Sequence, residues 1–530
     1  MMRIMKRLSV LPLAVLLAVG ACSKSPVPGE EPGLHGGSID NLSHGLIELG
    51  EKLEDPYTVE NMEKALRSLY PTKADRVDIH PTDLYVRFLP KDDAQLATLR
   101  SLGLYLVDHP LDYRIAREGD YYQDPDVGEG NITWQYSVVP HDFTFPSGIS
   151  YQVLDRCYIS EHSAETRSDI DWAAVEQESF RLTGNASMLP STKADAAVCP
   201  RGRITVMDPK FAGGKPVGLA GVKVAANIFV KIATCHTDRD GYYNMDTSFK
   251  GEPRYRLVFQ NSAGFSIGLN LIIIPASVST LGKGSPQGVD YTVTEQSDPA
   301  LFRRCAVNNA AYDYYSRCNS GDLDIAPPPS DLRIWIFPML KSSSTVMLHH
   351  GAILDHGLIQ KYVGQYIGII RIFLPDITIG TSGNDSFSAI YYATVHELSH
   401  ASHYSSVGNG FWSPYAGYIL RSFILEGGTA YGYGSGENAG LCEVGEMWAY
   451  FMAASLYKDR YGGSMPDFPS SLWFRPQILG LMYERGMSRA DIFRALTPEV
   501  TGRDDFKEEL IRMYPDRESL INECFARYER

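Results

Sequence analysis

The stretch SFSAIYYATVHELSHASHY, residues 386–404, constrains the fold of this chain more than any other segment. It contains neither proline nor glycine, and its apolar residues follow the three- to four-residue spacing of one helix face. The sequence therefore predicts a helix from about Ser386 to Tyr404. On such a helix His396 and His400 lie one turn apart on the same face, so both rings can reach one metal ion. Glu397 is placed to reach a water molecule on that metal.

This spacing is the H-E-x-x-H pattern of zinc peptidases, and a site of this kind needs a third protein ligand. His403 lies on the same helix face, but a straight helix separates it from His396 by about 10.5 Å along the axis. Three ligands cannot converge over that distance, so we expect His403 to be a solvated or supporting histidine. The metzincin pattern is also excluded, because it requires glycine at position 403 and histidine where this chain has Ser406.

The helical stretch ENAGLCEVGEMWAYFMAASLY, residues 437–457, carries two better candidates, Glu443 and Glu446. Here the chain resembles the gluzincin metallopeptidases, in which a glutamate on a downstream helix completes a His-His-Glu zinc site. The segment GEMWAYF matches the family's ligand glutamate followed by a small and then an aromatic residue, and this register selects Glu446. Glu443 is the alternative. Glu426 is a weaker one, because the glycines around it oppose a helix.

The resemblance implies zinc held by His396, His400 and Glu446, with Glu397 as the general base and later the general acid. Some gluzincins carry an aspartate four residues after the ligand glutamate to orient a zinc-bound histidine. This chain has Tyr450 there, so another group must supply that support. The donor for the oxyanion is left open among Tyr415, Tyr431, Tyr433 and His403. The insert between the motifs is either a substrate-facing loop or ordinary packing.

The first residues, MMRIMKRLSVLPLAVLLAVGAC, combine a basic start, an apolar run and small residues before Cys22. They predict a secretory signal segment at 1–21, too short to be a stable membrane span. Its end resembles a bacterial lipobox, which implies a lipid on Cys22 and anchoring at the bacterial cell envelope. A plain signal peptide cut near Ala21 is the alternative. Residues 22–45, rich in proline, glycine and serine, predict a flexible tether.

The remaining chain predicts a multidomain α+β protein. Residues 46–195 alternate helix and strand patterns, with strands at 83–90 and 104–113, and favour a small α/β domain. Residues 196–297 show the short strands and turns of an immunoglobulin- or transthyretin-type β-sandwich. Their segments PVGLAGVKV and CHTDRDGYYNMD resemble the carboxypeptidase-regulatory-like domain. Residues 298–530 are expected to form a mainly helical, zincin-like domain with a small sheet; SRAD at 488–491 and TGRD at 501–504 predict helix N-caps.

Composition limits the remaining possibilities. A formal net charge of −14, with no basic run after the first residues, argues against nucleic-acid binding. None of the eight cysteines forms a C-x-x-C pair, so neither a cysteine zinc site nor a thioredoxin-like motif is predicted. Cys305 and Cys318 are the nearest pair for a disulfide, which sequence alone does not establish. Asp238, Asp240 and Gly241 favour a β-turn over a calcium loop.

Together these features favour a lipid-anchored, zinc-dependent hydrolase of peptide bonds that acts on a protein or peptide at the cell envelope. The alternative is a surface binding or adhesion lipoprotein whose peptidase-like fold is not catalytic. The glutamate at position 397 favours the enzyme, because a binding protein needs no base beside the metal. A metal-dependent hydrolase of another bond, such as a deacylase, would use the same chemistry. The sequence does not fix the oligomeric state.

Overall fold

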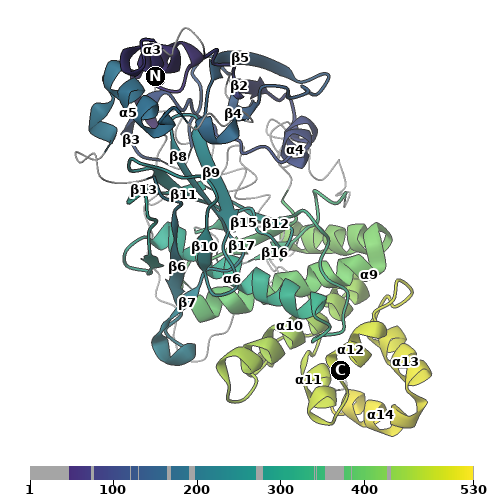
Figure 1. Ribbon diagram of the computed structural model, residues 1–530. Helices are drawn as coiled ribbons and strands as arrows, with labels where there is room; N and C mark the ends of the chain where they lie inside the picture. Colours follow the sequence, from purple (N-terminus) through teal and green to yellow (C-terminus); the bar gives the residue numbers. More distant parts are fainter. Residues whose placement is uncertain are drawn as a thin grey trace, which may run out of the picture.

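The computed structural model describes residues 47–528, apart from 73–76, 120, 129–130, 164–168, 190–196, 270–277, 339–340, 342, 352–374, 384 and 426–430. The predicted signal segment 1–21, the predicted tether 22–45 with Cys22, and Glu426 lie outside the described residues. The described part is a multi-domain α+β protein with five sheets and ten α-helices (Figure 1). None of its helices has both the length and the apolar character needed to cross a membrane.

The N-terminal elements lie at one end of the molecule in Figure 1. They are β1 (Glu48–Lys52), α3 (Val59–Leu69), β2 (Asp83–Leu89), α4 (Asp93–Ser101), β3 (Tyr113–Arg117), β4 (Gln135–Pro140), β5 (Ser150–Cys157) and α5 (Trp172–Leu182). β2 lies between β4 and β5, and β1 pairs with β3, all antiparallel. The predicted alternation of strand and helix therefore produces antiparallel pairing, so the expected α/β organisation of this region is wrong.

One predicted strand of this region is also wrong. Within 104–113 only Val107 makes an isolated bridge, to Tyr136, and the strand begins at Tyr113. Pro110 has no N–H to donate to a ladder, so extended pairing cannot continue through it. The turn made by this segment faces a cavity described below.

The middle of the chain forms two four-stranded sheets. Their strands are β6 (Arg201–Met207), β7 (Pro216–Gly218), β8 (Lys223–Ile228), β9 (Lys231–His236), β10 (Tyr242–Asn244), β11 (Arg254–Val258), β13 (Val278–Lys283) and β14 (Tyr291–Val293). One sheet has the order β10-β6-β14 with β7 also on β6, and the other has the order β13-β11-β8-β9. The Asp238 carboxylate accepts the N–H groups of Asp240 and Tyr242, each at 2.9 Å, which confirms the predicted turn.

A third four-stranded sheet supports the helix that carries His396, Glu397 and His400. Its order is β12 (Phe265–Leu269), β15 (Leu332–Phe337), β17 (Ile377–Gly380) and β16 (Ser344–Thr345). β12, β15 and β17 are parallel, and only β16 is antiparallel to its neighbour. β12 comes from the segment before the boundary expected at 297/298, so the sandwich segment and the third sheet share a strand. A single buried apolar cluster extends from Tyr57 to Phe525 through these regions.

Three long helices follow: α6 (Pro299–Asn319) and α9 (Phe387–Leu425) lie beside this sheet, and α10 (Ala439–Tyr461) packs against α9. The first part of α9 matches the helix predicted from about Ser386 to Tyr404 and ends before Gly408, where a second helical part begins that continues to Leu425. Gly408, at φ 67° and ψ −171°, breaks the axis and redirects the second half. That half carries the aromatic insert, which is helical and packed: Trp412 and Tyr415 are buried. Of the two alternatives for the insert between the motifs, a substrate-facing loop or ordinary packing, this part of the insert shows packing.

The described chain ends in four shorter helices: α11 (Gln477–Glu484), α12 (Arg489–Arg494), α13 (Arg503–Met513) and α14 (Glu518–Ala526). Ser488 and Asp491 form the predicted capping box of α12. The second predicted cap is wrong by one residue. Gly502 is the N-cap of α13, and the Thr501 hydroxyl donates instead to Asp505.

The seven cysteines of the described residues are all free. Cys305 and Cys318 both lie on α6, thirteen residues apart. At the rise of an α-helix this separates them by about 20 Å along the axis, far beyond disulfide reach.

Two glycines test how closely α10 is seated. A Cβ at Gly440, in the first turn of α10, would lie 2.2 Å from the Thr501 carbonyl oxygen, whereas a Cβ at Gly417 in α9 meets nothing within 4 Å. Alanine is favoured over glycine in a helix by about 0.8–1.0 kcal/mol. We expect Gly417→Ala to raise the free energy of unfolding by about 0.5–1 kcal/mol and Gly440→Ala to lower it by about 1–3 kcal/mol. Urea unfolding measures both changes. If the two variants changed the free energy of unfolding in the same direction, the close approach of Gly440 to Thr501 would be contradicted.

Candidate metal centre

Two helices bring the three predicted ligands together. α9 carries His396 and His400 one turn apart, and α10 packs against it and carries Glu446. His396 Nε2 lies 3.4 Å from Glu446 Oε2, and His400 Nε2 lies 3.4 Å from Glu446 Oε1. One ligand atom from each side chain lies within 4.8 Å of the others. All three residues are 0% exposed, and the cluster could bind a metal ion.

The polar atoms of this cluster lack the partners that burial demands. Among the described residues, no ring nitrogen of His396 or His400 makes a hydrogen bond, and neither does Glu446 Oε2. Glu446 Oε1 accepts a hydrogen bond from Tyr415 at 2.7 Å. Unpaired buried polar atoms are costly, and a cation held between them would remove that cost. The donor set therefore fits a metal.

The electrostatics of the cluster point the same way. Burial lowers the pKa of His396, which favours the neutral ring that a metal needs. Burial alone would raise the pKa of Glu446, but the charges and proximity of His400 and His396 outweigh it and hold that pKa below its usual value. The resting cluster thus offers two imidazoles and one carboxylate, ligand types that suit zinc and similar transition metals.

The alternatives considered for the third ligand lie elsewhere. Glu443 is buried one turn before Glu446 but is not part of the cluster, and it has other interactions. His403 is fully buried, so of the two expectations, a solvated or a supporting histidine, the solvated one is wrong. Its ring packs against Phe411 and Trp412, at centroid distances of 4.8 and 6.0 Å, and burial lowers its pKa to about 3.

Aromatic rings surround the two candidate ligand histidines. Tyr450, at the position expected for an orienting aspartate, packs edge-to-face on His396 with centroids 4.7 Å apart. Trp412 and Tyr415 lie against His400 at 5.9 and 5.8 Å. Neither histidine's Nδ1 has a hydrogen-bond acceptor among the described residues. Ring packing, rather than a hydrogen bond, therefore fixes the orientation of both imidazoles.

The four candidates for an oxyanion donor occupy different surroundings. Tyr415 donates to Glu446, and the Tyr431 hydroxyl lies 3.0 Å from that of Tyr450. Tyr433 is 71% exposed, and His403 is enclosed by aromatic rings. The structure brings only Tyr415 into contact with the cluster itself. In that position Tyr415 supports a ligand, a role that sequence reasoning missed.

Glu397 is held by a residue that no sequence pattern pointed to. The Thr345 hydroxyl, on β16, lies 2.8 Å from Glu397 Oε2 and 2.8 Å from the Glu397 carbonyl oxygen. Glu397 Oε1 has no hydrogen-bond partner among the described residues. Burial raises the pKa of Glu397 well above its usual value. Thr345 thus fixes one carboxylate oxygen, and no hydrogen bond from the described residues holds the other.

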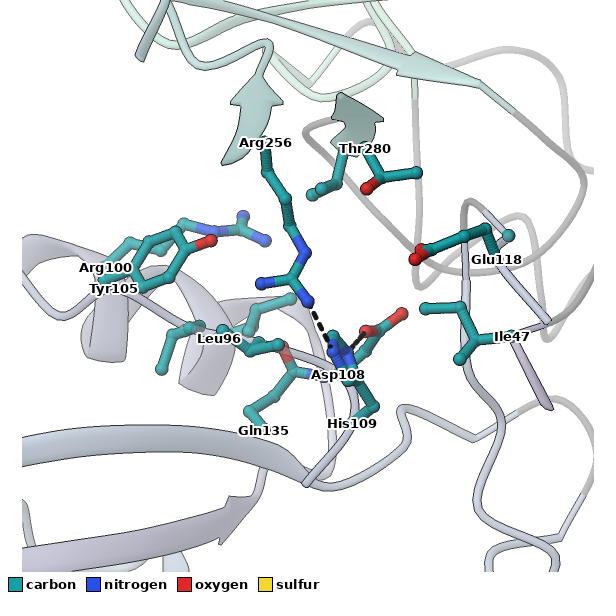
Figure 2. Close-up of a pocket in the computed structure, with 14 residues that line it drawn as sticks. Ile47, Leu96, Arg100, Tyr105, Asp108, His109, Glu118, Gln135, Arg256 and Thr280 are labelled. Atoms are coloured by element: carbon teal, nitrogen blue, oxygen red, sulfur yellow. Dashed lines mark hydrogen bonds and ion pairs between the residues drawn. The ribbon is translucent and has the colours of Figure 1, made fainter. Parts of the chain in front are cut away.

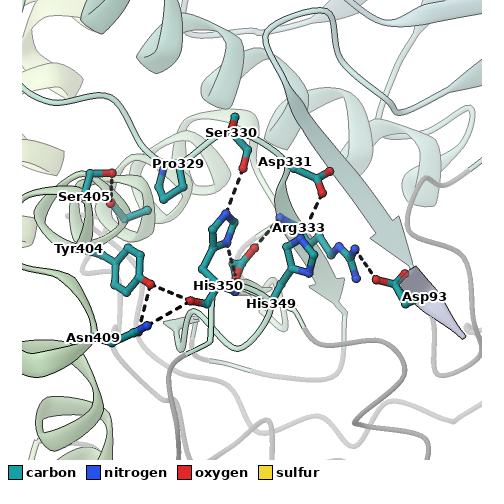
Figure 3. A network of polar contacts seen from close by, with 12 residues as sticks. Asp93, Pro329, Ser330, Asp331, Arg333, His349, His350, Tyr404, Ser405 and Asn409 are labelled. Carbon is teal, nitrogen blue, oxygen red and sulfur yellow. Dashed lines mark hydrogen bonds and ion pairs between the residues drawn. The ribbon is translucent and has the colours of Figure 1, made fainter. Parts of the chain in front are cut away.

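A polar network ties the far end of the motif helix to the third sheet (Figure 3). Tyr404 donates to the His350 carbonyl oxygen at 2.8 Å. His350 Nδ1 lies 3.0 Å from the buried Asp376 carboxylate, and its Nε2 lies 3.0 Å from the Ser330 carbonyl oxygen. Asp376 also accepts the N–H of Arg333 on β15. Because both ring nitrogens face acceptors, His350 donates to both only when it is protonated.

Comparison of the chain with models of protein families, with curated proteins and with solved structures finds no match in any of the three.

The His350 network gives a pH prediction. Burial lowers the pKa of His350, but the hydrogen bond and charge of Asp376 outweigh it and raise the pKa above 6.5. The stabilisation that the protonated His350 ring gives the folded state is complete below pH 6.5. It is lost as the pH rises through the raised pKa of His350. We expect His350→Gln to remove this pH-dependent part of the melting temperature. His349→Gln is the control, because its ring pairs with the exposed Asp331. An unchanged pH profile in His350→Gln would contradict the assignment.

The two glutamates of α10 give a metal-binding prediction. We expect Glu446→Gln to lower the affinity for a divalent transition metal by at least about 10- to 100-fold, since changes merely behind a ligand already cost that much. Glu443→Gln should bind as the unchanged chain does. Competition against a chromophoric chelator measures both affinities. Equal losses in the two variants would show that Glu446 is not a ligand.

Proposed function

We propose that this chain is a zinc-dependent hydrolase of peptide bonds of the gluzincin type. The observation that carries the proposal is the meeting of the Glu446 carboxylate with both motif imidazoles, across two helices, beside a glutamate whose carboxylate has one free oxygen. A site that only stored or transported a metal would need the three ligands and no such fourth residue. The spacing that suggested the peptidase family is here accompanied by the matching spatial arrangement.

His396, His400 and Glu446 would hold the zinc ion. Zinc held by two imidazoles and one carboxylate supplies a Lewis acid that polarises a carbonyl group and makes water acidic near neutral pH. Tyr415 donates to Glu446 and so fixes the carboxylate that faces the two rings. The surrounding aromatic side chains exclude bulk water, which strengthens the electrostatic interactions within the cluster.

Glu397 is the general base of the proposed reaction. Thr345 holds its Oε2, so the unpaired Oε1 is the atom that takes a proton from the attacking water. The same carboxyl group then donates that proton to the leaving amine nitrogen. Among the side chains considered for the oxyanion, Tyr415 has its hydroxyl proton committed to Glu446.

The rest of the chain supports a domain arrangement and a location for the proposed enzyme. The two four-stranded sheets of the middle region support a carboxypeptidase-regulatory-like sandwich that positions a zincin-like domain. The third sheet, with its single antiparallel edge strand beside α9, supports the zincin-like assignment. We further propose that Cys22 carries a lipid that anchors the protein at the bacterial cell envelope, where its substrate is a protein or peptide.

One observation favours a second candidate. His396, Glu397, His400 and Glu446 are all 0% exposed, and a substrate must reach the glutamate for hydrolysis to occur. A metal so enclosed would instead stabilise a binding or adhesion lipoprotein whose peptidase-like fold is not catalytic.

Replacement of the proposed base separates the two candidates. We expect Glu397→Gln to keep about one zinc ion per chain and to lose peptide hydrolysis by about 10²- to 10⁴-fold, because the ligands remain and the proton acceptor is removed. Zinc analysis and cleavage of a broad peptide library measure the two properties. Glu443→Gln is the matched buried-glutamate control and should keep both. Full zinc loading of the unchanged chain without cleavage of any peptide would favour the binding protein.

A further inference from the structure

A small cavity lies where the N-terminal region meets the sheet β13-β11-β8-β9 (Figure 2). Its volume is about 40 Å³, room for about three water molecules, since one needs roughly 10–15 Å³. Arg256 enters from β11 and Thr280 from β13, while Arg100 and Tyr105 enter from the end of α4 and the segment after it. The cavity is remote in sequence from the metal cluster and has no residue in common with it.

Arg256 is a buried cation whose hydrogen-bond partners are neutral. It is 4% exposed and donates to Asn227 Oδ1 at 2.9 Å and to His109 Nε2 at 2.8 Å. A guanidinium can only donate, so His109 Nε2 accepts, and the ring proton sits on Nδ1, 2.9 Å from Asp108 Oδ1. Burial, and then the charge of Arg256, lower the pKa of His109 and keep this ring neutral. The Asp108 charge is therefore one imidazole away from the guanidinium.

Arg100 is the second cation of the cavity. Among the described residues its guanidinium forms no hydrogen bond or ion pair, and burial lowers its pKa to about 10. Arg100 is half-buried, and Asp93, whose charge favours its protonated form, is already paired with Arg333. A counter-ion in the cavity would therefore stabilise the guanidinium, which the last turn of α4 places in the cavity lining.

The two carboxylates that line the cavity have other partners. Asp108 accepts from His109 and from the N–H of Tyr122 at 2.7 Å. Glu118 pairs with Arg254, the neighbour of Arg256 on β11. The lining contains two arginines and two acidic residues, but Glu118 pairs with Arg254 outside the lining, so neither Arg100 nor Arg256 pairs directly with a lining carboxylate.

We propose that this cavity is a binding site for a small oxyanion, inorganic phosphate or a simple carboxylate, held between Arg256 and Arg100. Guanidinium groups are the preferred partners of both anions. The Thr280 hydroxyl accepts from the N–H of Gly282, and its own proton is directed at no described acceptor, so it is a further donor. Because Arg256 belongs to a sheet of the middle region and Arg100 to α4, the anion would join the two regions.

Thermal unfolding in matched salts tests the site. At constant ionic strength, we expect phosphate at 20 mM to raise the melting temperature by at least about 2 °C over chloride, since a ligand stabilises the state that binds it. Sulfate and acetate form parallel arms that separate a tetrahedral from a planar anion. Arg100→Gln and Thr280→Val should each lose at least half of the shift. Arg87→Gln, which removes a guanidinium stacked on Trp134, should keep all of it.

The same measurement in Glu446→Gln separates this site from the metal cluster. The shift should persist there, because no cavity residue touches Glu446. Loss of the shift in Glu446→Gln, its full retention in both Arg100→Gln and Thr280→Val, or the absence of any oxyanion effect beyond chloride would each overturn the proposal. The outcome does not depend on whether the chain hydrolyses peptides.

Discussion

The contact between α9 and α10 is the interaction on which the rest of the structure depends. It places two imidazoles and a carboxylate in a volume without solvent, where each would be costly alone. Apolar contacts between α9 and α10 offset that cost. Trp448 is fully buried between them, and its indole N–H donates to the Ser399 carbonyl oxygen at 3.1 Å. The apolar packing of the two helices thereby stabilises a polar cluster whose burial would otherwise be unfavourable.

The sequence predicted the three side chains of the cluster and Glu397, but not the side chains that support them. Helical periodicity was enough to put His396 and His400 on one face, since that relation is set within one turn. The register of Glu446 came from a family pattern, and the structure agrees with its placement beside the histidines. Thr345 escaped prediction because it lies 52 residues from Glu397, on a two-residue strand with no motif of its own. Only the pairing of β16 with β17 brings it there.

Fold errors have equally local causes. The helix predicted to end near Tyr404 is followed, after the change of axis at Gly408, by a second helical part with a new buried face that the apolar stripe did not indicate. A single-face stripe cannot predict a helix that presents two faces to the core. The strand expected at 104–113 has the right composition but contains Pro110, and the pairing ends before it. In both cases one residue with a special backbone overrides the pattern around it.

α4 connects the two sites of the molecule. Its first residue, Asp93, pairs with Arg333 on β15, and Arg100 in its last turn lines the anion cavity. Arg333 in turn donates its N–H to Asp376, which lies against His350, and His350 contacts Tyr404 on the motif helix. Polar contacts therefore link the first residue of α4 to α9, and Arg100 is joined to them only through the α4 backbone. Such contacts give the two sites a common structural support. Energetic coupling between the sites would also require one of these elements to have two conformations whose populations depend on both sites. An anion that immobilised α4 would stiffen the support of α9 without changing its position.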